Sequence, residues 1–102
     1  MAYLTNIDHS ITALGYGVTT VGTAGTDVVL GTAVCKKIAL QAQTDNTGYI
    51  AVGTSGVDAT VATGNGVLLS AGDVFVIQTD NLSDVSIDST VNGEGVRYTY
   101  FT

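Results

Sequence analysis

The stretch NGVLLSAGDVFVIQTDNLSDVSID, from Asn65 to Asp88, decides the fold class of this chain. Its three apolar runs are short and rich in valine, leucine and isoleucine, and Asn, Asp and Gly residues that favour tight turns separate them. Short apolar runs bounded by turn residues predict β-strands rather than helices. The stretch carries no obvious catalytic group.

The same pattern continues over most of the chain. From Gly15 onward glycine recurs every few residues, proline is absent, and Val, Ile and Thr are frequent. The expected strands are Gly17–Val21, Val28–Gly31, Cys35–Gln43, Tyr49–Gly53, Val67–Leu69, Asp73–Gln78, Val85–Asp88 and Gly95–Phe101. Because crossover helices are missing, these strands predict a single all-β domain over residues 17–102, an antiparallel β-sandwich or jelly roll.

Residues 1–16 form a separate N-terminal arm in this interpretation. Leu4, Ile7, Ile11 and Leu14 are spaced by three and four residues, as on one face of a short helix. The β-branched residues of this segment lose side-chain freedom in a helix, and an extended arm on a neighbouring subunit fits equally well. Both interpretations stay open, and the arm is favoured because a glycine-rich segment follows.

Alternation of apolar and polar residues assigns faces to the strands. The residues expected to face the core are Ile38, Leu40, Ala42, Ile50, Val52, Val85, Ile87, Val96, Tyr98 and Tyr100. Those expected to face outward are Lys37, Gln41, Ser86, Asp88, Arg97 and Thr99. The run Val74–Ile77 is apolar on both faces, so this strand is either covered on both sides or exposes Phe75 at an interface.

Charge and composition exclude several kinds of partner. The net charge is -6, and charged residues make up 12% of the chain, about half the usual share. Neither nucleic acid nor an anionic membrane is an expected partner, because both require clustered Lys and Arg. A weakly charged, Thr-rich surface suits packing against copies of itself or a larger partner. We expect no secretory signal and no membrane span. Cys35 is expected to be a small buried hydrophobe.

The chain offers little for catalysis, and we expect it not to be an enzyme and to bind no cofactor. His9 is the only histidine, and its neighbours in Asp8-His9-Ser10 point in different directions, so they cannot form a catalytic triad. Asp80, Asp84 and Asp88 form the best acidic cluster, and carboxylates can hold Ca²⁺. Their spacing of four does not match an EF-hand loop, and a turn rich in Asp and Asn explains them better. Five tyrosines are candidates for stacking on sugars, although tyrosines in strands are more often core or interface residues.

Two segments carry a resemblance to a known class of proteins. They are KKIALQAQTDNTGYIAVGTSGVDATVATGNGVLLSAGDVFVIQTDNLSDVSID from Lys36 to Asp88, and VNGEGVRYTYF from Val91 to Phe101. The order of an Asn-Thr-Gly turn with IxVG, then NGxxLxAGD, DNLSDVxID and GxxVxYxY resembles small virion proteins of tailed bacteriophages. The resemblance covers about two thirds of the chain, from Lys36 on, and its motifs are structural rather than catalytic.

The resemblance implies a role on the virus particle. Proteins of this type are small β-sandwiches or jelly rolls, often trimeric, that decorate a capsid as cement proteins or form the base of a head fibre. It implies the major capsid protein as partner, a homotrimer, and a virion location after assembly in the host cytoplasm. A fibre or tail module that binds a surface glycan, and a neck or tail-completion protein, are the alternatives. The residues expected at interfaces are Tyr3, Leu4, Ile7, Phe75 and Phe101.

Overall fold

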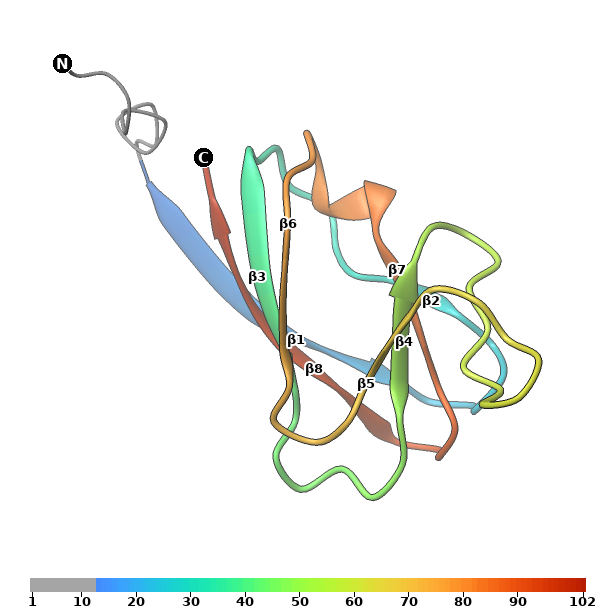
Figure 1. The fold of residues 1–102 in the computed structure, drawn as a ribbon. Coiled ribbons are helices and arrows are strands. Elements are labelled where there is room, and N and C mark those ends of the chain that lie inside the picture. The colour runs from blue at the N-terminus through green and yellow to red at the C-terminus, as the bar shows by residue number, and fades with distance from the viewer. Residues whose placement is uncertain (1–12) are drawn as a thin grey trace, which may run out of the picture.

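The computed structural model describes residues 13–102, and within them eight strands form two antiparallel sheets packed face to face (Figure 1). The strands are β1 (Leu14–Val21), β2 (Val28–Val29), β3 (Lys37–Ala42), β4 (Ile50–Gly53), β5 (Val67–Leu69), β6 (Val74–Ile77), β7 (Ser86–Ser89) and β8 (Glu94–Phe101). A 3₁₀ helix, η2 (Leu82–Asp84), precedes β7, with Asn81 as its N-cap. The all-β sandwich expected from the sequence is confirmed, and each expected strand overlaps an observed one.

The strand order follows from nested pairing of distant segments. Sheet A has the order β1-β8-β3-β6 and sheet B the order β2-β7-β4-β5. The pairs β1–β8, β2–β7, β3–β6 and β4–β5 are all antiparallel, so the first half of the chain pairs with the second half in reverse. Except for β4 and β5, consecutive strands lie in opposite sheets. The chain therefore crosses repeatedly from one sheet to the other around a single core.

The core lies between the sheets and follows the expected alternation. Ile38, Leu40 and Ala42 of β3 are buried, as are Ile50 and Val52 of β4, Val85 and Ile87 near β7, and Val96 of β8. Tyr98 and Tyr100 are half-buried and pack against this cluster. Since β3 and β8 are the two central strands of sheet A, their inner side chains lie in the middle of the core.

Ser86 and Asp88 lie on the outer face of sheet B, as expected, but they are not exposed to solvent. Both are buried, and Asp88 is only 1% exposed. The outer side of sheet B is covered because Ala51 of β4 packs against Val57 and Ala59 of the following connection. Alternation separated the two faces of β7 correctly, but it could not show that a long connection covers the outer one.

The predicted boundary between arm and domain also needs correction, because β1 begins at Leu14 and not at Gly17. Gly15 and Gly17 belong to this strand, where they pair with Tyr100 and Tyr98 of β8. A Cβ atom on Gly15 would lie 2.3 Å from the ring of Tyr100, and one on Gly17 would lie 2.6 Å from the Tyr98 hydroxyl. These glycines are therefore strand positions that make room for aromatic rings, rather than turn positions.

Candidate interaction surface

The outer surface of sheet A exposes a group of large apolar side chains. We call it the A face; its residues are Leu14, Tyr16, Val18, Lys37, Ala39, Gln41, Val74, Val76, Arg97, Thr99 and Phe101, which the strand register places on one side of the sheet. Tyr16 is 85% exposed, and Leu14, Val18, Val74 and Val76 are each more than half exposed. Contiguous apolar surface of this kind marks an interaction site in a soluble protein.

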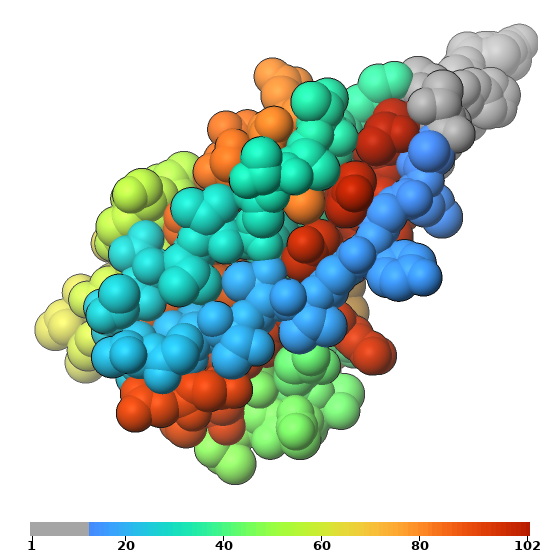
Figure 2. Space-filling view, turned by 180° about the vertical axis from the view of Figure 1, so that it is seen from behind, coloured from blue at the N-terminus to red at the C-terminus, as the bar shows by residue number. Residues whose placement is uncertain are grey.

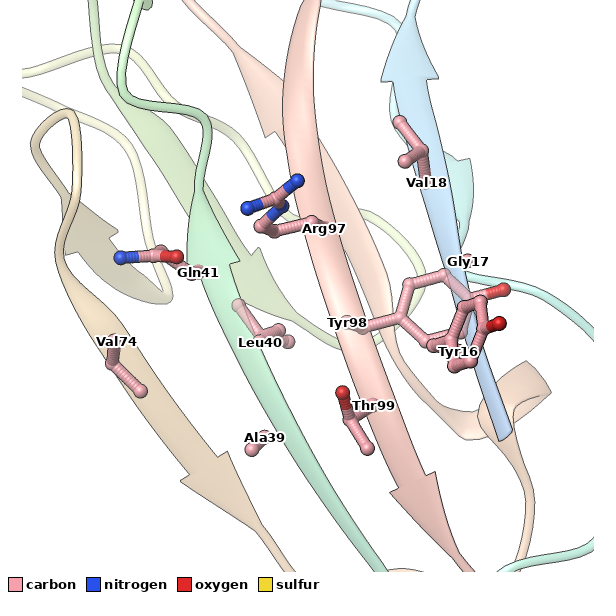
Figure 3. Close-up of a pocket in the computed structure, with 10 residues that line it drawn as sticks. All are labelled: Tyr16, Gly17, Val18, Ala39, Leu40, Gln41, Val74, Arg97, Tyr98 and Thr99. Carbon is pink, nitrogen blue, oxygen red and sulfur yellow. The ribbon is translucent and has the colours of Figure 1, made fainter. Parts of the chain in front are cut away.

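The A face is hollowed along its middle. Across the sheet, Tyr16 aligns with Thr99, Ala39 and Val76, so that small side chains lie between large ones. The side chains of β1 and β6 form two apolar walls around a depression of about 470 Å³, which we call the A-face trough (Figure 3). A trough with apolar walls, and with the small residues Ala39 and Thr99 on part of its floor, fits an elongated apolar segment better than a compact polar molecule.

The polar groups of the A face are cationic or neutral. Arg97 and Gln41 stand next to each other on β8 and β3 at one end of the trough (Figure 3). In the row of the A face beyond Ala39 and Thr99, the Lys37 ammonium lies 5.1 Å from the centre of the Phe101 ring. The A face thus holds two of the three basic residues of a chain with net charge -6, and no carboxylate. A complementary partner would present apolar side chains together with an acid.

The two outer strands of sheet A leave backbone groups without a neighbouring strand. Among residues 13–102, β1 pairs only with β8, and β6 pairs only with β3. The Thr102 N–H donates to the Ala13 carbonyl at 2.9 Å, so antiparallel alternation directs the N–H and C=O groups of Leu14, Tyr16 and Val18 away from β8. Figure 2 shows β1 (blue) crossing this surface beside β8 (red). Such an edge is a template for pairing with another chain.

The predicted interface residues have different outcomes. Phe101 lies on the A face, opposite the core set, as the alternation indicated. Phe75 does not: it pairs with the buried Leu40 and packs half-buried against the core, so Val74 and Val76 are the exposed residues of β6. In a strand that is apolar on both faces, alternation gives no sign of which face is inside. Tyr3, Leu4, Ile7 and His9 lie outside the described residues.

The sequence analysis missed the wall formed by β1. The segment Leu14-Gly15-Tyr16-Gly17-Val18 places an apolar side chain at every second residue, with glycine between. That alternation was the available signal for a strand with large side chains on one face only, but the glycines suggested turns instead.

The three acids considered as a cation site do not come together. Asp88 is buried and accepts hydrogen bonds from the Gly25 N–H at 3.0 Å and the Ala59 N–H at 2.8 Å. Asp84 is exposed and accepts from the Thr79 hydroxyl at 2.7 Å. No group of three or more His, Cys, Asp or Glu residues within positions 13–102 is arranged to hold a metal ion. Through these two hydrogen bonds, Asp88 instead holds the β1–β2 and β4–β5 connections against sheet B.

The thiol of Cys35 is a poor candidate for chemistry. Cys35 is buried, as expected, and its Sγ donates to the Thr79 carbonyl oxygen at 3.3 Å. Burial raises the pKa of this thiol, and the carboxylates of Asp84 and Asp80 raise it further. A thiol kept protonated in an apolar site is a weak nucleophile.

Comparisons of the chain with protein-family models, with curated proteins and with solved structures gave no significant match. Along residues 13–102, no helix has the length and hydropathy needed to cross a bilayer.

Proposed function

We propose that this protein is a structural component of a bacteriophage virion, a capsid decoration or cement protein that binds the outer capsid surface and stabilises the particle. The observation that carries the proposal is the A face, a surface with exposed apolar side chains whose two outer strands each pair with only one other strand among residues 13–102. Such a surface suits a protein whose function is to bind other subunits.

The fold type supports the virion setting. We infer that the sandwich is a jelly roll, because its strands pair in the nested order β1–β8, β2–β7, β3–β6 and β4–β5 across two four-stranded sheets. Jelly rolls are widespread in viral capsid domains, although lectins and cupins share them. The resemblance of the segments from Lys36 on to phage virion proteins favours the first of these classes.

The energetics suit a part present in many copies. With four strands about 4.8 Å apart and three rows of side chains, the A face covers roughly 400 Å², about half of what one partner buries in a standard interface. A single contact of this size is weak, but many contacts on a repeating lattice add up through multivalency. A cement protein that binds only the assembled shell, with the major capsid protein as its partner, fits this balance.

The test compares particles with and without the protein. Particles that lack it are expected to release DNA at a lower temperature, and adding purified protein back should restore the wild-type temperature. Protein carrying Val18→Lys on the A face should fail to restore it, whereas protein with the control substitution Val61→Lys, at a similarly exposed position outside the A face, should succeed. Equal heat resistance of particles with and without the protein would contradict the proposal.

One observation favours a second function, adhesion to a host surface glycan by a head-fibre or tail module. Tyr16 is 85% exposed and stands at the trough that Arg97, Gln41 and Thr99 also line. An exposed aromatic ring beside hydrogen-bonding groups is a suitable platform for a sugar. Glycan-array binding that is lost in Tyr16→Ala but kept in Tyr49→Ala, a tyrosine outside the trough, would favour adhesion over cementing.

A further inference from the structure

We infer that the A-face trough binds residues 1–12 of a second copy of this chain. The inference rests on the proposed function and deepens it: it takes the A face as the contact between copies in the homotrimer that the resemblance implies. The argument depends on the shape of the trough, its charge, its area and the point at which the described chain begins.

The first step concerns shape and apolarity. The walls of the trough are Tyr16 and Val18 on one side and Val74 on the other, and the floor includes Ala39 and Thr99. Two apolar walls on either side of a floor two strands wide leave room for a chain segment that carries apolar side chains. Residues 1–12, MAYLTNIDHSIT, supply Tyr3, Leu4, Ile7 and Ile11.

The second step concerns charge. The trough is lined by the guanidinium group of Arg97, and the A face has no acid. The only carboxylate in residues 1–12 is Asp8, in the middle of the apolar residues. Most of the surface of this acidic chain repels another carboxylate, whereas this face attracts one.

The third step concerns area and reach. The A face alone offers roughly 400 Å², whereas a stable complex needs about 800 Å² from each partner. A segment bound along the trough buries its own surface in addition to that of the A face. Twelve residues span up to about 40 Å when extended, several times the length of the three rows of side chains.

The fourth step separates a second copy from the chain's own segment. The described chain begins at Ala13, beside Thr102, and runs directly into β1, which is itself one wall of the trough. To enter its own trough, the preceding segment would have to reverse immediately before this strand. Residues 11–13 contain no glycine, proline, asparagine, aspartate or serine, the residues best suited to such a turn. A second copy needs no reversal.

The experiment uses disulfide capture between two full-length chains of different mass. One chain carries a cysteine at Leu4→Cys, Ile7→Cys or Ile11→Cys, and the other carries Ala39→Cys at the trough floor. After mixing and mild oxidation, we expect at least one pair to give a covalent heterodimer, at ten times or more the yield obtained with Val61→Cys in place of Ala39→Cys. The native chain, whose Cys35 is buried, provides the background.

Two results would overturn the inference. One is a yield for all three positions no higher than with the Val61→Cys control, since a segment bound in the trough brings at least one of them near position 39. The other is a doubly substituted single chain that closes on itself while mixed chains do not cross-link, because the chain's own segment then occupies the trough.

A second measurement keeps this inference separate from the virion role. Light scattering of the full chain should detect an oligomer. Its dissociation constant should rise at least tenfold in Val76→Lys but stay unchanged in Val34→Lys, an exposed control outside the A face. A monomer at every concentration would overturn the inference. If the protein forms this oligomer but particles with and without the protein resist heat equally, the result overturns the cement function and leaves the inference about the trough intact.

Discussion

At the scale of single residues, Asp88 shows how a carboxylate is kept inside a small β-sandwich. It has no basic partner in the described hydrogen bonds; its two oxygens accept from the Gly25 and Ala59 N–H groups, which come from different connections. Two backbone donors to one buried carboxylate replace part of its lost hydration. Asp88 therefore fixes both connections over the outer side of sheet B.

Replacing Asp88 by alanine is expected to lower the free energy of unfolding by about 2–4 kcal/mol, because the change leaves a buried N–H without an acceptor. Urea denaturation followed by fluorescence or circular dichroism measures the change. The matched control is Asp84→Ala, which removes an exposed carboxylate and should cost less than about 1 kcal/mol. Equal losses for the two variants would contradict the role given to Asp88.

At the scale of elements, β1 depends on the aromatic rings of its neighbour. The side of β1 that faces the core has glycine at positions 15 and 17, and Tyr100 and Tyr98 of β8 fill the space that side chains would take. The centroids of the Tyr98 and Tyr100 rings lie 6.3 Å apart. The first half of β1 therefore packs onto the core through its partner's side chains, while its own large side chains lie on the A face.

The substitution Gly17→Ala is expected to destabilise the fold by about 1–3 kcal/mol, because a methyl group at this position overlaps the Tyr98 ring. The control is Gly22→Ala, where no atom lies within 4 Å of the added carbon, and its effect should stay within about 0.5 kcal/mol. The midpoints of urea denaturation compare the two. A harmless Gly17→Ala would mean that Tyr98 does not need the space above this glycine.

The connection between β3 and β4 is held by one carboxylate at the start of β8. Glu94 accepts from the Thr47 N–H at 2.6 Å, the Thr47 hydroxyl at 2.8 Å and the Gly48 N–H at 2.9 Å. The Thr47 N–H contributes most to lowering the pKa of Glu94, partial desolvation raises it, and the Gly48 N–H and Thr47 hydroxyl lower it further. The net pKa in the folded protein lies below the usual value.

This shift sets the sign of a pH effect. A group whose pKa is lower in the folded state stabilises the fold above its unfolded pKa, near 4.3 for Glu, and loses that contribution as the pH falls through its folded pKa. The melting temperature of the native chain should therefore fall more steeply below about pH 5 than that of Glu94→Gln. Parallel melting curves for the two proteins across this range would contradict the role of Glu94.

At the scale of the whole molecule, nested pairing makes almost every strand depend on distant parts of the chain. β1 pairs with β8 at the other end of the described residues, and only β4 and β5 are consecutive partners. The fold therefore forms as one cooperative unit, in which long loops close before the pairings stabilise it. The same arrangement leaves the A face and its two strand edges exposed on one side, available to another copy.

Self-association through this side predicts a stability that depends on protein concentration. Binding of one folded chain to another removes folded monomers from the unfolding equilibrium, so the melting temperature should rise by about 4 °C or more over a roughly hundredfold increase in concentration. Calorimetry or fluorescence melting measures this. Val76→Lys should abolish the dependence and Val34→Lys should keep it; a melting temperature independent of concentration in the native chain would contradict association.

The sequence by itself determined the all-β class, the approximate position of each strand and most of the core, because alternation with period two and turn residues act locally. Ile38, Leu40 and Ala42 are buried as that pattern required. Only the tertiary structure decided which side of Val74–Ile77 faces the core, that a connection covers Ser86 and Asp88, and that Leu14, Tyr16 and Val18 form a wall beside β8. These features depend on which distant strands become neighbours, and a local pattern that is apolar on both faces, or interrupted by glycine, carries no information about that choice.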